Sequence, residues 1–190
     1  APNWYWMGLA YYRKGNYDEA IPAFKKVIEL RPEGIQYESS YAFLGWSYYN
    51  KANYSDAVNY FAKSLELSPR NTGSLGGIGW SYHWLSDYDS ALKYFNKMME
   101  ITVNDDILMA RAWTYFAKGM INEAYADADK AISLNSQKEG GYRIRGWVKY
   151  FRGNYHEALR DLNSSIERIV ADKWALMARQ HALRGKAISY

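Results

Sequence analysis

The sequence predicts an all-α fold, a solenoid of stacked helix pairs, because similar residues recur about every 34 positions. Four columns of residues share the intervals 37, 34, 33 and 34. Shared intervals in four columns indicate a structural repeat rather than an accident of composition. The columns are Gly8, Gly45, Gly79, Ala112, Gly146; Ala20, Ala57, Ala91, Ala124, Ala158; Tyr17, Tyr54, Tyr88, Ile121, Tyr155; and Phe24, Phe61, Phe95, Ala128, Leu162.

Each repeat is predicted to contain two helices. In the first repeat, apolar residues recur at helical spacing from Trp4 to Tyr11, and the sequence Gly15-Asn16-Tyr17 then breaks the helix. A second apolar stripe begins after Asp18, a residue suited to a helix N-terminus, and continues to Pro32. Helix pairs of this length cannot bury their apolar faces alone, so we expect neighbouring pairs to stack.

The run Trp4, Gly8, Tyr11, Gly15, Tyr17, Ala20, Phe24 and Pro32 resembles a tetratricopeptide repeat (TPR). The resemblance implies one right-handed superhelical solenoid over residues 1–190, with about five helix-turn-helix units followed by a C-terminal capping helix at 172–186. A repeat truncated after its first helix is the alternative for that last segment. The expected units span residues 1–34, 38–71, 72–104, 105–138 and 139–170.

Composition limits the classes of function. The chain has no cysteine, which excludes disulfides and cysteine chemistry, and no apolar run reaches the roughly 18 residues of a membrane-spanning helix. Localisation stays open between cytoplasm and periplasm. Residues 1–138 hold 14 basic and 15 acidic residues, whereas residues 139–190 hold 10 and 5. The excess positive charge therefore lies at the C-terminal end.

Catalytic and cofactor sites are not expected. The three histidines, His83, His156 and His181, fall in different repeats without metal-ligand spacing. The glycine-rich run from Gly73 to Gly79 lacks the spacing and ending of a phosphate-binding loop. We therefore predict a protein that is not an enzyme and that has no metal or cofactor.

Two arginines at apolar positions of the first helices have matching acids. Arg111 and Arg145 replace apolar residues of the earlier repeats, and the same two repeats place Asp127 and Asp161 where the others have alanine or tyrosine. Because arginine occurs only together with aspartate, we interpret the pairs as structural ion pairs within each repeat.

The aromatic content of 17% is the unusual part of the composition. In TPR proteins the first helices line the concave surface, so the resemblance places two aromatic columns there, three residues apart on one helix face. Either the rings stiffen the stack, or they form a groove for a peptide; both can hold. With basic residues at the last inner positions, the predicted partner-binding residues are Trp46, Trp80, Trp113, Trp147, Tyr12, Tyr49, His83, Phe116, Tyr150, Arg143 and Arg179.

The resulting functional hypothesis is a protein–protein interaction scaffold that binds a peptide segment or partner helix in an aromatic-lined concave groove. The positions at which chaperone-binding TPR domains carry a carboxylate clamp have no positive charge here, so that mode is not expected. Carbohydrate or single-stranded nucleic acid on the same aromatic ladder is the alternative, nucleic acid being the less favoured. Self-association through exposed solenoid ends is a further possibility, and no membrane partner is predicted.

Overall fold

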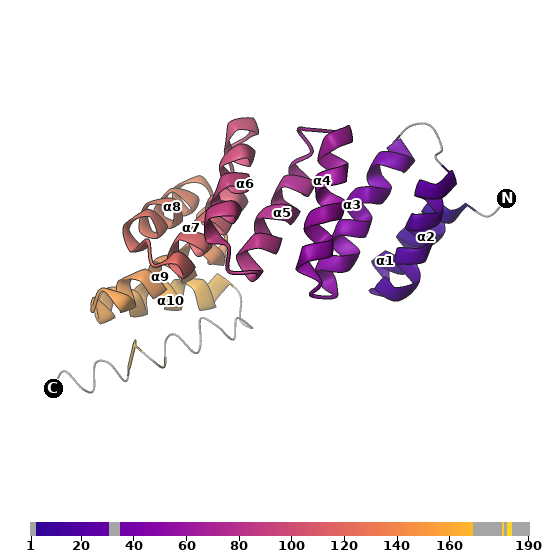
Figure 1. Cartoon of the computed structure of the whole chain (residues 1–190). Coiled ribbons are helices and arrows are strands. Elements are labelled where there is room, and N and C mark those ends of the chain that lie inside the picture. The colour runs from indigo at the N-terminus through magenta and orange to yellow at the C-terminus, as the bar shows by residue number, and fades with distance from the viewer. Residues whose placement is uncertain (1–2, 31–34, 169–179, 181, 184–190) are drawn as a thin grey trace. The chain divides into compact units, whose positions relative to one another are not determined.

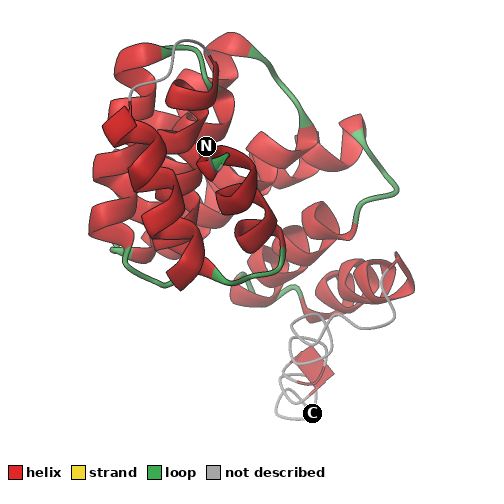
Figure 2. Cartoon of the chain, turned by 90° about the vertical axis from the view of Figure 1, so that its right-hand side faces the viewer, coloured by secondary structure: helices red, strands yellow, loops and turns green. Residues whose placement is uncertain are grey.

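The computed structural model describes residues 3–30, 35–168, 180 and 182–183. This part of the chain contains ten α-helices arranged as five consecutive pairs, and none of the described residues is in a β-strand, so the all-α prediction is confirmed (Figure 2). Within the described residues, no helix combines the length and the apolar character needed to cross a membrane. The chain divides into two compact units, Ala1–Ile101 and Thr102–Tyr190, and each is treated by itself.

Unit 1 contains three helix pairs, one for each of the first three repeats (Figure 1). Within it, α3 packs against α1 and α5, the first helices of the neighbouring repeats, as well as against α2 and α4. The first helices thus lie side by side. The helices are α1 (Trp4–Arg13), α2 (Tyr17–Leu30), α3 (Ile35–Asn50), α4 (Tyr54–Leu67), α5 (Thr72–Trp84) and α6 (Tyr88–Ile101).

Unit 2 contains the helix pairs of the fourth and fifth repeats. Its first helices, α7 and α9, contact each other directly, and each also packs against its own second helix. The helices are α7 (Asp105–Lys118), α8 (Ile121–Leu134), α9 (Glu139–Phe151) and α10 (Tyr155–Arg168).

The turn inside each repeat has the same backbone conformation. Its last residue before the cap adopts a positive φ, between 58° and 84°, at Gly15, Ala52, Ser86, Gly119 and Gly153. A side chain at the next position then caps the second helix in two repeats: Asn53 accepts from the backbone N–H of Asp56, and Asp87 accepts from that of Ser90. These hydrogen bonds satisfy amides that have no partner within the helix.

The core lies between the two helices of each pair. Phe24, Phe61 and Phe95 are fully buried. A Cβ atom built on Gly45 would lie 2.5 Å from the Phe61 ring, and one on Gly79 would lie 2.6 Å from the Phe95 ring. The small column therefore makes room for the phenylalanine column, as the sequence predicts.

Two expectations stay predictions. A single solenoid across residues 1–190, with the five unit boundaries given above, is one of them. The capping helix at 172–186 is the other, because that segment lies outside the described residues apart from three positions, Gln180, Ala182 and Leu183.

Candidate binding face

The predicted aromatic columns divide between the two units. We call Tyr12, Trp46, Tyr49, Trp80, His83 and Trp84 the unit 1 aromatic face, and Trp113, Phe116, Trp147, Tyr150 and Phe151 the unit 2 aromatic face. All of the residues in the predicted columns are half-buried except His83, which is buried. Each residue comes from the first helix of its repeat, where positions three apart lie on the same side.

In unit 1 the tryptophans are partly used for packing. The Trp46 ring meets the buried Phe61 edge-to-face, with centroids 5.1 Å apart, and Trp80 meets Phe95 in the same way at 5.5 Å. Such contacts hold the indole rings in fixed orientations. Both contacts join the two helices of one repeat, so stiffening of the stack by these rings stays a prediction, and the rings remain partly exposed.

A neighbouring column links consecutive repeats, and the sequence analysis missed it. Trp84 donates from Nε1 to the Tyr49 hydroxyl of the preceding repeat at 2.8 Å and stacks on Tyr54. Phe151 meets Phe116 of its preceding repeat edge-to-face at 5.3 Å. Both residues directly follow the predicted columns, and their own spacing in the repeat was the signal that could have identified them.

These two linking rings are also the most exposed members of the faces. Trp84 is 53% exposed and Phe151 is 62% exposed. A large ring that is fixed by its neighbours but open to solvent is the kind of side chain that carries energy at interfaces. We therefore add Trp84 and Phe151 to the candidate binding residues.

Burial changes the titration of the unit 1 face. It raises the pKa of the Tyr49 phenol, against a lowering by the hydrogen bond from Trp84, and it also raises the pKa of Tyr12. Burial lowers the pKa of His83, whose imidazole lies edge-to-face against Trp80, Trp84 and Tyr88. The face is therefore uncharged at neutral pH.

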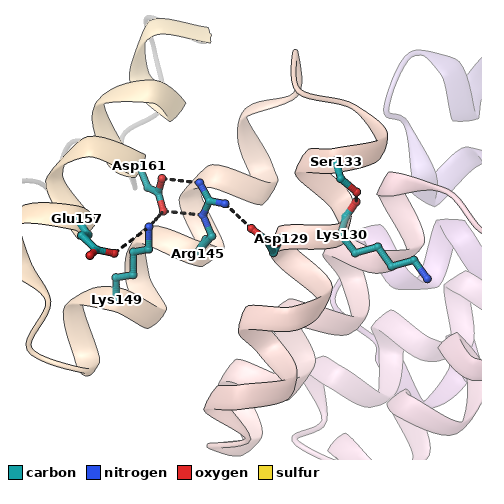
Figure 3. A network of polar contacts seen from close by, with 7 residues as sticks. All are labelled: Asp129, Lys130, Ser133, Arg145, Lys149, Glu157 and Asp161. Carbon is teal, nitrogen blue, oxygen red and sulfur yellow. Dashed lines mark hydrogen bonds and ion pairs between the residues drawn. The ribbon is translucent and has the colours of Figure 1, made fainter.

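Unit 2 carries charge on its first helices instead. Arg145 donates from Nε and Nη2 to both carboxylate oxygens of Asp161, each at 2.8 Å, and from Nη1 to Asp129 at 2.5 Å (Figure 3). The Lys149 Nζ atom lies 2.9 Å from Oδ2 of Asp161 and 3.4 Å from Oε2 of Glu157. Asp161 is thereby shared between two cations, which satisfy its buried carboxylate.

The equivalent pair in the fourth repeat has the same geometry. Arg111 donates from Nε and Nη2 to the two oxygens of Asp127, at 2.6 and 2.8 Å. The structure confirms both predicted ion pairs as contacts between the two helices of one repeat. Of the two basic site residues, Arg143 lies half-buried on α9, and Arg179 lies outside the described residues.

The space beside Gly76 and Gly77 of α5 is occupied by neighbouring side chains. A Cβ on Gly77 would lie 2.3 Å from the Phe61 ring, and one on Gly76 would lie 3.4 Å from Met98. Both glycines are buried. They are sites of close packing, so they do not floor a pocket.

Among the described residues, no group of three or more histidine, aspartate, glutamate or cysteine side chains is placed to hold a metal ion. His83 and His156 belong to different units, and His181 is outside the described part.

Comparison with known families gives one consistent result. Three family models, each described as a tetratricopeptide repeat, match residues 1–70, 44–101 and 105–138. No curated protein sequence matches the chain.

Many solved structures match the fold of this chain. A tetratricopeptide repeat protein from Parabacteroides merdae has a TM-score of 0.81 at 19% identity, over 95% of this chain and 71% of its own. A thermophilic TPR protein from Thermus thermophilus has a TM-score of 0.74 at 17% identity, over 96% of this chain and 98% of its own. MamA from Desulfovibrio magneticus has a TM-score of 0.77 at 15% identity, over 90% of this chain and 95% of its own. At these identities the likeness establishes the helical-repeat solenoid fold alone.

Proposed function

Because the chain belongs to the tetratricopeptide repeat family, we propose that it is a protein–protein interaction scaffold whose aromatic faces hold a peptide segment or a partner helix. The family consists typically of non-catalytic binding scaffolds. The observation that carries the proposal is the pair of fixed but exposed rings, Trp84 and Phe151, beside half-buried tryptophans.

The mode of binding differs from a carboxylate clamp. In unit 1 the inner positions at which a clamp would place cations hold Tyr5, Leu9, Phe43, Gly73 and Gly77. None of these side chains carries the positive charge with which a clamp holds a carboxylate. Affinity is instead expected from burial of aromatic surface, which rings of this size supply in large amounts.

Selection from a library of displayed random peptides tests the proposal. We expect the intact protein to enrich peptides, and we expect Trp84→Ala to weaken their binding at least about tenfold, the effect of losing one interface hot spot. Trp84→Ala should fold normally because its ring is half open to solvent. Leu67→Ala, which truncates another exposed side chain of unit 1, is the matched control.

The same immobilised protein can be probed with a glycan array and with a single-stranded RNA. Enrichment of sugars or RNA without any peptide would contradict a protein-binding role. Trp113→Ala and Phe151→Ala, tested against the same peptides, report whether unit 2 takes part.

A further inference from the structure

The first helices of unit 1 contain no charged side chain over most of their length. None occurs in Trp4–Tyr12, Ser39–Asn50 or Thr72–Trp84, whereas α7 and α9 of unit 2 carry aspartate, glutamate, lysine and arginine. A partner charge buried against the unit 1 aromatic face would meet no counter-charge from these helices, which is costly. The complementary partner segment is therefore uncharged where it contacts this face.

Two equivalent aromatic corners lie on adjacent helices of unit 1. Trp46 and Tyr49 on α3 meet at 78° with centroids 5.4 Å apart, and Trp80 and His83 on α5 meet at 72° and 5.3 Å. Each corner offers a flat ring beside a perpendicular one. Because His83 is buried, Trp80 is the ring of the second corner that a partner can contact.

The spacing expected between the two helices favours one backbone conformation for the partner. Because α3 packs directly on α5, their axes are expected to be ~8–10 Å apart. A polyproline II helix has three residues per turn and rises about 3.1 Å per residue, so every third residue returns to the same side after about 9.3 Å. An extended strand returns after about 6.7 Å, which is shorter than the spacing between the helices.

The face also provides a hydrogen-bond donor and a stacking surface. The Tyr49 hydroxyl oxygen accepts from Trp84, so its own proton can be donated to a partner carbonyl. One side of the Trp84 ring stacks on Tyr54 with centroids 6.3 Å apart, and the ring is 53% exposed. Polyproline II segments expose unpaired carbonyl groups and prolyl rings, which match these two features.

We infer that the unit 1 aromatic face binds an uncharged, proline-rich segment in the polyproline II conformation, with prolines three residues apart stacked on the Trp46 and Trp80 rings. This inference rests on the proposed scaffold function and names the chemistry of its partner. The rings are already fixed by Phe61, Phe95 and Tyr54, so little order has to be created on binding.

Fluorescence anisotropy with two labelled synthetic peptides tests the inference on the full chain. Both are uncharged, about 13 residues long and identical in composition, each with four prolines, but the prolines lie three residues apart in one peptide and four residues apart in the other. A four-residue period turns successive prolines to different sides of the polyproline helix. We expect the first peptide to bind about tenfold more tightly or better, and Trp84→Ala to remove most of this preference while Leu67→Ala keeps it.

Equal affinity of the two peptides, or no binding by either, would overturn the inference. Its failure can be told apart from failure of the scaffold proposal by the peptide library. If the library yields binders that depend on Trp84 but have no proline period, the scaffold function stands and the polyproline inference falls. If neither probe nor library binds, both are wrong.

Discussion

Arg111 and Asp127 occupy positions that hold Leu44 with Tyr60 in the second repeat and Ile78 with Tyr94 in the third. The sequence predicted this ion pair because both partners change together. It did not predict that Arg145 would bind Asp129 of the preceding repeat as well as Asp161, since that contact depends on how two helix pairs stack. Ion pairs within one repeat can thus be predicted from the sequence columns, whereas contacts between repeats become visible only in the packed structure.

Removing one partner of the Arg111–Asp127 pair should be costly. The side chains are 19% and 9% exposed, so Asp127→Ala leaves a largely buried guanidinium without its acid. We expect the free energy of unfolding to fall by about 2–4 kcal/mol, somewhat less than the ~3–5 kcal/mol of a fully buried pair because solvent screens part of the charge. Urea denaturation measures the change.

The double variant Arg111→Ile/Asp127→Tyr, which restores the residues of the third repeat, is the control. We expect it to recover most of the lost stability, because an apolar pair of this kind already packs in the neighbouring repeats. A double variant as unstable as Asp127→Ala would show that the pair is specific to its site.

His83 should make the fold sensitive to acid. Burial among Trp80, Trp84 and Tyr88 lowers its pKa, so the unfolded chain binds a proton more readily than the folded one. The contribution of neutral His83 to the free energy of unfolding is therefore fully present above the ordinary histidine pKa of 6.5, and it is lost as the pH falls below that value. We expect His83→Phe, the residue that the fourth repeat has at this position, to reduce the loss of urea resistance between pH 7.5 and pH 5.

The exposed His156 provides the comparison for this experiment. His156→Gln should leave the pH dependence of the urea midpoint unchanged. If His83→Phe also left it unchanged, protonation of His83 would not be the cause of acid sensitivity.

At the scale of helices, two adjacent glycines of α5 should respond to alanine in opposite directions. At Gly77 the new Cβ would lie 2.3–2.7 Å from Phe61, so we expect Gly77→Ala to destabilise the fold by about 1–3 kcal/mol. At Gly76 the nearest atoms belong to the end of Met98, at 3.4 Å, so the higher helix propensity of alanine should prevail, by up to about 1 kcal/mol. Thermal melts of both variants would check the signs, and destabilisation by both would show that Met98 cannot yield.

The helices themselves could be predicted closely, whereas the exposure of their rings could not. The columns predicted each helix pair because a small residue on the first helix faces an apolar residue on the second, as Gly45 faces Phe61 and Gly146 faces Leu162. Trp84 was not predicted because its column holds Arg13, Asn50 and Ala117 in three of the repeats, although Phe151 shares the column in the fifth. Its role follows from contact with Tyr49, a residue 35 positions earlier.

At the scale of the whole molecule, the two units are stabilised by different interactions. In unit 1 the pairing positions between helices are apolar or aromatic, with Tyr48 stacked on Tyr60 and Tyr82 on Tyr94. Unit 2 has charged groups there, in the pairs formed by Arg111, Arg145 and Lys149. The division after Ile101 was not predicted, because the repeat columns continue across it with an interval of 33, only one residue shorter than the intervals of 34 on either side.

This difference predicts an unequal response to salt. Raising the ionic strength to about 1 M shortens the Debye length to ~3 Å and weakens the partly exposed ion pairs of unit 2, whereas apolar contacts are not weakened by screening. Hydrogen exchange followed by mass spectrometry should then show α7–α10 losing protection relative to α1–α6. In Arg111→Ile/Asp127→Tyr the loss should shrink in α7 and α8 and persist in α9 and α10, where Arg145 keeps its acids. An equal change in protection across both units would contradict the assignment of ion pairs as the distinguishing support of unit 2.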